Sequence, residues 1–401
     1  MKNNVQTKHA PSRLIDDYSD PALPQDRDRP CFAETPPEQT AFYESALEAL
    51  TAAMPSGSTV RAVGFDRADV FLRAGYKVVE GDADVTVARG GEREFDVARK
   101  TSCRKLILVP THAYCAAASP LYRTQDEAFA VMARGQKPFA AVFDPTDTDA
   151  NLASIFGETV ALDLAAFDLT FCAYMRGERL DVRLLSDVAS LVTELTAELK
   201  AAEKNRAETT RALVRAGSRA ARIVERRPEL LHFSGAAQTA EALRMLYSAE
   251  DRPLGMRGET EMLLAAYVTD FYIKSLTTVR PEFPPDNNKR IDSVCEYFGA
   301  DIRRACVYAT AIYPPFKMRL CEYRRDEFRA EQLRLLTELK QRQLAAWQVF
   351  KRLYGDDGFG LKTLVDKTDV AICLALAPDV FAVDTMLSFL KQTGRLEKYI
   401  V

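Results

Sequence analysis

The sequence predicts an α/β N-terminal lobe, built on a shortened parallel sheet, followed by an all-α C-terminal lobe. Three observations support this fold class. Before about residue 157, short runs are almost uniformly apolar, as in parallel strands that are covered on both faces. Helical patterns separate some of these runs. Beyond that point the runs give way to amphipathic helical periodicity, broken by proline and glycine.

The chain divides into three predicted parts. Residues 1–37 form an arm rich in proline and charge, which we expect to be extended or disordered. Residues 38–155 form the α/β lobe, and residues 156–401 form the helical lobe. A length of 401 residues with 47% hydrophobic content is enough to fill the cores of two lobes.

The α/β lobe begins with a predicted amphipathic helix over Gln39–Ala53. The predicted strands that follow are Thr59–Val63, Tyr76–Val79, Val85–Ala88, Leu106–Val109 and Phe139–Phe143. Two further helices are predicted between strands, over Asp66–Ala74 and Glu94–Ser102. This order of strands and helices predicts a small parallel sheet.

The sequence shows no internal repeat, and amphipathic helices are expected to fill the second lobe. Segments that carry proline or glycine separate them. The predicted helices are Gly157–Tyr174, Ser186–Val224, Ala237–Ser248, Glu259–Thr277, Lys289–Ala311, Arg325–Tyr354 and Asp379–Thr393.

The composition argues against several classes of protein. The net charge of −3 gives no general attraction to nucleic acid, and the basic run Arg222–Arg227 contains a glutamate, which favours a solvated helix face over a nucleic-acid patch. We expect a cytoplasmic protein without a membrane span, because no long apolar run and no signal-peptide core is present. The eight cysteines include no C-x-x-C pair, which favours reduced thiols over disulfides or a zinc site.

A turn with two glycines is the main functional motif. Gly90 and Gly91 lie between a predicted strand and a predicted helix, where glycine lets backbone N–H groups approach a phosphate at the helix N-terminus. A simple tight turn would also use two glycines, and that alternative stays open. The candidate cofactor-binding residues are Gly90, Gly91, Arg93, Asp96 and Thr111.

Several sequence blocks follow the order found in one superfamily. Gly90–Arg99 resembles the GGGSxxDxAK signature of the dehydroquinate synthase-like superfamily, which includes iron-containing alcohol dehydrogenases, glycerol dehydrogenase and sn-glycerol-1-phosphate dehydrogenase. Ala153–Glu178 resembles the sn-glycerol-1-phosphate dehydrogenase form especially well. The other similar blocks are Val109–Pro120, Ser234–Met245, Leu254–Glu259 and Thr385–Ile400, so the resemblance covers residues 57–401.

The resemblance implies an NAD(P)-binding α/β lobe and a divalent metal held between the lobes by one Asp and two His. In this sequence the Asp position falls on Glu158, and the two His positions fall on Gln238 and Arg257. An arginine keeps its proton and has no acceptor atom, so it cannot ligate a metal. We therefore expect no metal. The candidate catalytic residues are Arg257, Glu158 and Gln238.

The phosphate turn also departs from the family pattern. The third glycine and the serine of the signature are Glu92 and Arg93 here, and a glutamate places negative charge beside a bound pyrophosphate. Only about 30 residues separate Thr59 from Gly90, which is room for one βαβ unit. The pocket for the adenosine side of a dinucleotide is therefore expected to be smaller than in the family.

One arrangement would account for the altered metal position. If Glu158 and Arg257 face each other, the guanidinium takes the place of the cation, and Gln238 hydrogen-bonds the remaining carboxylate lone pair. Two histidines have open roles. His112 lies in the loop over the turn, and His232 precedes the predicted helix Ala237–Ser248. Each of them either contacts a ligand or is structural.

Two functions remain open at this point. The resemblance implies an oxidoreductase that uses NAD or NADP on a polyol or polyol phosphate, in which Arg257 would stabilise the developing alkoxide. The alternative is a catalytically inactive pseudoenzyme that keeps the fold as a ligand-binding or assembly module. The expected partners are a small phosphorylated or polyol ligand and, in a homo-oligomer, further copies of the chain.

Overall fold

The computed structural model describes most of the chain between residues 40 and 278 and between residues 326 and 392. Within these limits the undescribed residues are 113, 127–128, 146–148, 177–180, 182, 203–204, 232–233, 251, 253, 255–256, 356–364 and 381–383; residues 292, 294–297 and 396 are also described. The predicted N-terminal arm and most of the predicted helix Lys289–Ala311 lie outside the described residues.

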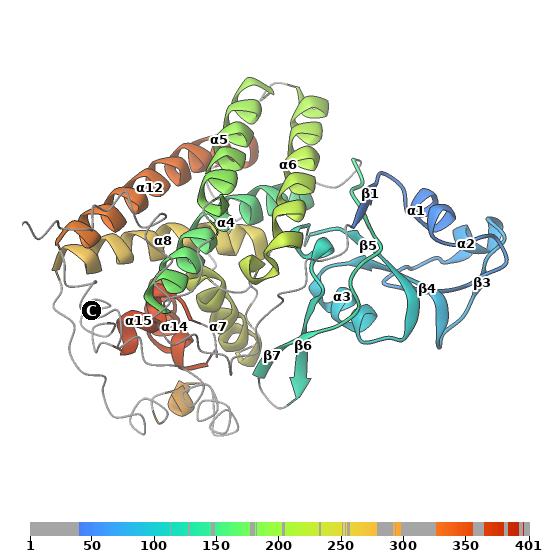
Figure 1. Cartoon of the computed structure of the whole chain (residues 1–401), viewed down its shortest axis with the longest axis horizontal. Helices are drawn as coiled ribbons and strands as arrows, with labels where there is room; N and C mark the ends of the chain where they lie inside the picture. The colour runs from blue at the N-terminus through green and yellow to red at the C-terminus, as the bar shows by residue number, and fades with distance from the viewer. Residues whose placement is uncertain are drawn as a thin grey trace, which may run out of the picture.

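A parallel six-stranded sheet forms the N-terminal part, as predicted (Figure 1). The strand order is β1-β8-β5-β4-β2-β3, and every pairing is parallel. The two longest strands lie in the middle, so their carboxyl ends meet at the same end of the sheet. The strands are β1 Ala41–Tyr43, β2 Thr59–Val63, β3 Lys77–Val78, β4 Ala83–Gly90, β5 Cys103–Pro110 and β8 Ala140–Val142.

Alternate residues of the central strands belong to two separate cores. Ile107 of β5 packs in the core that Leu50 and Phe71 complete from one side of the sheet. Leu108 belongs to the other core, together with Phe95. Both faces are therefore buried, which explains why these strands are continuous apolar runs in the sequence. The covering helices are α1 Ala46–Ala53, α2 Asp69–Arg73 and α3 Glu92–Arg99.

The first part of the predicted helix Gln39–Ala53 is wrong, because Ala41–Tyr43 forms strand β1. Contacts distant in sequence hold this strand. β1 pairs with β8, and the guanidinium of Arg222 lies 4.7 Å from the ring centroid of Phe42. The helical periodicity of the local sequence does not reveal these partners. The tertiary contacts override the local preference for a helix. A second sheet, the antiparallel hairpin of β6 (Leu121–Asp126) and β7 (Phe129–Arg134), is also not indicated by the sequence pattern.

Helices make up most of the remaining described chain, as predicted, and none of those described is long and apolar enough to cross a membrane. The first of them, α4, begins at residue 149 rather than 157. The predicted boundary between residues 155 and 156 therefore falls inside α4, and the division into domains stays a prediction. The helices are α4 Asp149–Arg176, α5 Leu184–Ala202, α6 Arg206–Arg226, α7 Gly235–Ala249, α8 Arg257–Thr278, α12 Asp326–Tyr354, α14 Lys367–Val380 and α15 Met386–Gln392.

Two predicted helices have different limits in the structure. The predicted helix Ser186–Val224 is the pair α5 and α6, because the Asn205 side chain caps α6 by accepting a hydrogen bond from Glu208 N at 3.3 Å. The predicted helix Asp379–Thr393 is also incorrect. Asp379 belongs to α14, which the sequence pattern does not indicate, and α15 begins only at Met386.

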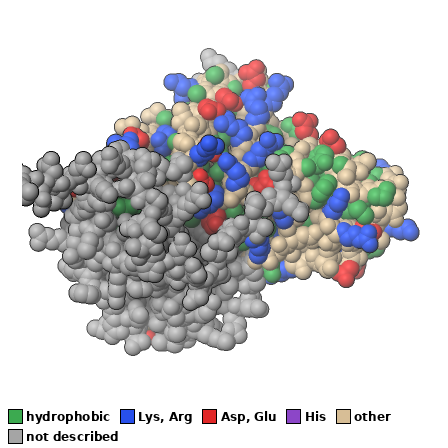
Figure 2. Space-filling view, in the orientation of Figure 1, with side chains coloured by type: hydrophobic (Ala, Val, Ile, Leu, Met, Phe, Trp, Pro, Cys, Tyr) green, Lys and Arg blue, Asp and Glu red, His purple; other side chains and the backbone are tan. Residues whose placement is uncertain are grey.

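The outer face of α5 and α6 is covered by paired charges. Figure 2 shows basic and acidic side chains intermixed over this region of the surface. Such exposed pairs contribute little stability each, and they leave few unpaired arginines for an anionic partner. This arrangement agrees with a solvated helix face for the basic run. The pairs are Arg215–Glu198, Arg219–Glu194 and Arg226–Asp187, with N···O distances of 2.8, 2.6 and 2.9 Å.

The central helix α4 is anchored by a buried carboxylate on one side. Asp163 binds Arg342 of α12 through both oxygens, at 2.7 and 3.0 Å. The Asp163 side chain is only 1% exposed, so this bidentate pair is its main compensation for lost water.

A second buried carboxylate of α4 joins three distant segments. Asp168 accepts hydrogen bonds from Gly235 N at 2.7 Å, Met386 N at 2.9 Å and the Tyr272 hydroxyl at 3.0 Å. The two amides belong to the first residues of α7 and α15, where backbone N–H groups have no partner within the helix. Burial raises the pKa of Asp168 to about 7, although these donors oppose the shift.

Replacing Arg342 tests the first of these anchors. Arg342→Met leaves the Asp163 carboxylate buried without a cation, so the free energy of unfolding should fall by about 3 kcal/mol in urea denaturation. The matched control is Arg334→Met on the same helix, where the guanidinium is 53% exposed and pairs with Glu331 and Glu338. Its effect should stay within about 1 kcal/mol. Equal losses in both variants would contradict this account.

The pH dependence of stability tests the second anchor. Because the pKa of Asp168 is about 7 when folded and about 3.9 when unfolded, the folded state binds the proton more tightly. The free energy of unfolding should therefore fall as pH rises from about 4 to about 7, by up to about 1.4 kcal/mol per pH unit. In Asp168→Asn this slope should be absent. Urea denaturation at pH 5 and pH 8 measures it, and identical slopes in both proteins would refute the assignment.

Candidate functional site

The predicted phosphate turn lies at the carboxyl ends of the two central strands. Gly90 ends β4, and Thr111 N, just beyond β5, donates a hydrogen bond to Gly90 O at 2.9 Å. Gly90 has a φ of +142°, which favours glycine. Gly91 is the N-cap of α3. The structure therefore brings Gly90, Gly91 and Thr111 together, at the place where doubly wound sheets bind their ligands.

The chain's own side chains fill this turn. Gly91 N donates a hydrogen bond to Oε2 of Glu94 at 2.8 Å, so a carboxylate already occupies the position that a phosphate would take at the start of α3. The ring of His112 covers Gly91 so closely that a Cβ there would lie 1.9 Å from Nε2. His112 Nδ1 is 2.9 Å from the Thr111 hydroxyl. In this arrangement the turn does not fit a pyrophosphate group.

His112 is held in place by packing and by its neighbours. Burial lowers the pKa of His112, and the nearby Glu94 carboxylate opposes this shift. Of the two open roles for His112, the structure supports a structural one, because the ring covers the glycine turn. His232 lies outside the described residues.

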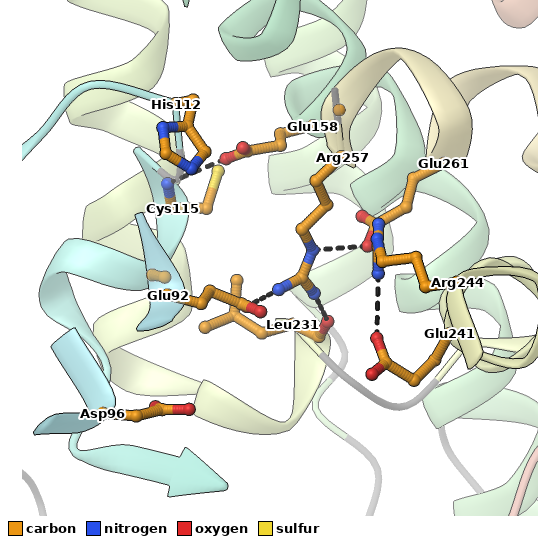
Figure 3. A network of polar contacts seen from close by, with 12 residues as sticks. Glu92, Asp96, His112, Cys115, Glu158, Leu231, Glu241, Arg244, Arg257 and Glu261 are labelled. Carbon is orange, nitrogen blue, oxygen red and sulfur yellow. Dashed lines mark hydrogen bonds and ion pairs between the residues drawn. The ribbon is translucent and has the colours of Figure 1, made fainter. Parts of the chain in front are cut away.

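The other two candidate cofactor residues lie on α3. Arg93 is exposed in the first turn of the helix. A carboxylate oxygen of Asp96 is 3.7 Å from Nη1 of the buried Arg99. In Figure 3 Asp96 lies apart from the polar network of the pocket. Their role in binding a cofactor stays a prediction.

A small pocket lies between α3, α4 and α8, and Arg257 dominates it. Arg257 is the first residue of α8, and its side chain is 10% exposed. Its Nε donates to Glu261 Oε1 at 2.5 Å, its Nη2 donates to Leu231 O at 2.8 Å, and its Nη1 forms an ion pair with Glu92 (Figure 3). The guanidinium is thus held by its own helix, by the chain before α7 and by the first turn of α3.

Glu158 lies in the same pocket, on α4. One of its oxygens accepts a hydrogen bond from Cys115 N at 3.2 Å, and the other lies 3.5 Å from the Ser154 hydroxyl. Burial raises the pKa of Glu158 well above its ordinary value, and the Glu261 carboxylate adds to the shift. These two causes favour the protonated form of Glu158, which can then donate a hydrogen bond into the pocket.

The structure brings together two of the three candidate catalytic residues. Glu158 and Arg257 both line the pocket, but they do not form an ion pair, because Arg257 binds Glu92 and Glu261 instead. Gln238 is directed elsewhere. Its Oε1 accepts a hydrogen bond from the Thr385 hydroxyl at 3.2 Å, and it does not line the pocket. The arrangement predicted for these three residues is therefore wrong in its pairing, although Glu158 and Arg257 line the same pocket.

Glu92 and Glu261 are site residues that the sequence analysis did not assign. Glu261 follows Arg257 by four residues, the spacing at which opposite charges meet on a helix, but the predicted helix began only at Glu259 and so left Arg257 out. The partnership of Glu92 with Arg257 has no local signal, since the residues are 165 positions apart in sequence.

Little free space remains in the pocket. Its cavity volume is about 10 Å³, roughly enough for one water molecule. The apolar part of its wall comes mainly from Ala161, Leu162 and Ala165 of α4 and from Leu230. A substrate can enter only if one of the polar side chains moves.

Comparisons with known proteins place the fold. No family model and no curated protein matches the sequence. Among solved structures, a 1,3-propanediol oxidoreductase has 13% sequence identity and a TM-score of 0.53, with 91% of this chain and 96% of that one covered. A halo-thermophilic archaeal alcohol dehydrogenase from a Red Sea brine pool has 12% identity and a TM-score of 0.51, with 92% and 99% covered.

The chain has the fold of the iron-containing alcohol dehydrogenases. At this level of identity the likeness shows the fold alone, and activity has to be argued from the site.

The residues at the expected metal position of the iron-containing alcohol dehydrogenase fold do not fit a divalent metal. One position holds a guanidinium, which offers no lone pair, and another holds an amide directed at Thr385. Among the described residues, no group of three His, Cys, Asp or Glu side chains is placed to hold a metal ion. The expectation that the purified protein contains no metal stays a prediction.

The close contact between His112 and Gly91 can be tested by mutation. Gly91→Ala places a methyl group against the His112 ring, so the free energy of unfolding should fall by about 1–3 kcal/mol. The loss should be smaller in the His112→Ala background, where the ring is absent. Gly81→Ala is the matched control, because a Cβ there meets no atom within 4 Å. Equal losses from Gly91→Ala in both backgrounds, measured by urea denaturation, would contradict the described turn.

Proposed function

We propose that this chain keeps the alcohol dehydrogenase fold without metal-dependent hydride transfer, and that it acts as a pseudoenzyme whose pocket between α3, α4 and α8 binds a small ligand. The observation that carries the proposal is the position of Arg257. The sequence resemblance implies a metal ligand at this position, and here three partners surround a guanidinium instead. A guanidinium keeps its proton and has no lone pair to offer a divalent ion, so it cannot act as a metal ligand.

The glycine turn supports the same proposal. Glu94 accepts a hydrogen bond from the N-cap amide of Gly91, and the His112 ring covers the same glycine. A pyrophosphate would have to displace these groups and would then meet a carboxylate at close range. The residues present therefore favour neither a metal nor a dinucleotide.

The sequence blocks suggest the ancestry of the pocket. Their likeness to sn-glycerol-1-phosphate dehydrogenase supports an ancestor that acted on a polyol phosphate. The α4 segment carries most of this likeness, and it also provides Glu158 and the apolar wall of the pocket. We infer that the ligand site has been kept in position while its chemistry has changed.

A second candidate is an NAD- or NADP-dependent oxidoreductase that works on a polyol or polyol phosphate without a metal. The fold comparison favours it, because the similar structures are named as an oxidoreductase and an alcohol dehydrogenase. In such an enzyme Arg257 would stabilise negative charge on the substrate oxygen. The protonated Glu158 carboxyl would be the nearby group able to exchange a proton with it.

Thermal unfolding with added ligands separates the two candidates. If the chain is a pseudoenzyme, none of four added ligands should raise the melting temperature saturably. These ligands are NADH, NADPH, Zn²⁺ and Fe²⁺. A true cofactor at 100 times its dissociation constant would stabilise the folded state by about 2.7 kcal/mol. Metal analysis of the purified chain and NADH oxidation with polyol substrates complete the test. Saturable NADH stabilisation would support the oxidoreductase, and stoichiometric metal would overturn the proposal.

A further inference from the structure

The three donors of Arg257 are not equivalent. Nε and Nη2 are held by Glu261, one turn further along the same helix, and by the main-chain oxygen of Leu231. These partners fix the plane of the guanidinium from the helical side. Nη1 is directed across the pocket, and its partner Glu92 comes from α3 (Figure 3). The guanidinium of Arg257 is therefore fixed in place, and its Nη1 atom is directed at a carboxylate.

Glu92 is the partner most able to leave. Its side chain is 17% exposed, compared with 9% for Glu261, and it stands at the first residue of α3. The position of α3 depends on other residues, because Phe95 and Ala98 are fully buried and Glu94 caps the helix. Rotation of the Glu92 side chain into water therefore leaves the packing of α3 in place.

The charge balance identifies the kind of ligand that can replace it. Arg257, Glu92 and Glu261 together carry a net charge of −1. A ligand with a single carboxylate restores this balance when Glu92 leaves, whereas a phosphate dianion adds a further negative charge beside Glu261. The apolar wall of Ala161, Leu162 and Ala165 suits a short aliphatic tail next to that carboxylate.

We propose that the pocket binds a small aliphatic monocarboxylate, which replaces the Glu92 carboxylate on Nη1 of Arg257. This inference rests on the ligand-binding role proposed above and specifies the ligand class. Glu92 then acts as a tethered internal competitor. It closes the pocket when the ligand is absent and protects the buried cation from being left unpaired.

Ligand-observed NMR of propionate with the full-length chain measures the binding and tests the proposal. Propionate should bind saturably to the unmodified protein. Glu92→Gln should lower the dissociation constant at least about tenfold, because it removes the competing charge while keeping the side-chain shape. Propionamide, which is neutral, and inorganic phosphate should not bind in competition with propionate.

Two arginine variants show whether the binding is at Arg257. Arg257→Lys keeps the charge but loses the planar fork, so the dissociation constant should rise at least about tenfold. Arg244→Lys is the matched control, since Arg244 pairs with Glu241 on α7 and does not line the pocket. It should bind propionate as the unmodified protein does. If Arg257→Lys does not fold, the comparison of Glu92→Gln with the unmodified protein decides.

The proposal is overturned if Glu92→Gln binds propionate no more tightly than the unmodified protein, if neither binds it saturably, or if phosphate competes more strongly than propionate. An NADH titration on the same samples keeps the two proposals apart. NADH binding overturns the pseudoenzyme proposal whatever propionate does. Absence of propionate binding without NADH binding overturns only the assignment of the ligand class.

Discussion

The pocket is organised by one physical requirement, which is that a buried guanidinium must keep its partners. Arginine cannot shed its charge at any ordinary pH, so Arg257 has to be neutralised and hydrogen-bonded within the protein. Glu261, Leu231 and Glu92 meet this requirement from three different segments. The result fixes the start of α8 against the chain before α7 and against α3. It also leaves a cavity of only about 10 Å³ between them.

Much of the fold could be predicted from local sequence patterns. The central strands are buried on both faces and are therefore unmistakable as apolar runs, and the long helices follow from their amphipathic periodicity. The failure at β1 depends on contacts between distant residues. Ala41–Tyr43 looks like the start of a helix until β8 is beside it. The start of α6 depends instead on a local contact, because the Asn205 side chain accepts a hydrogen bond from Glu208 N.

The site could be predicted in part. The family resemblance selected Glu158 and Arg257, which line one pocket, but their catalytic role stays a prediction. It could not show how the substituted side chains repack. Gln238 turns to Thr385 because its amide needs a buried partner, and Arg257 takes Glu92 from across the pocket. Such rearrangements follow from hydrogen-bond satisfaction in three dimensions, which residue-by-residue transfer does not consider.

The place of β1 in the sheet has a consequence for how this chain is made. Ala41 pairs with Ala140, and Thr40 donates its amide to Glu225, which is 185 positions further along the chain. During synthesis β1 emerges from the ribosome long before either partner exists, and the cost of closing such long loops delays its pairing. The outer edge of β8 is therefore uncovered until the chain folds back on itself. Until residues 140–142 and Glu225 have been made, β1 lacks these partners, and its edge is open to wrong strand pairing.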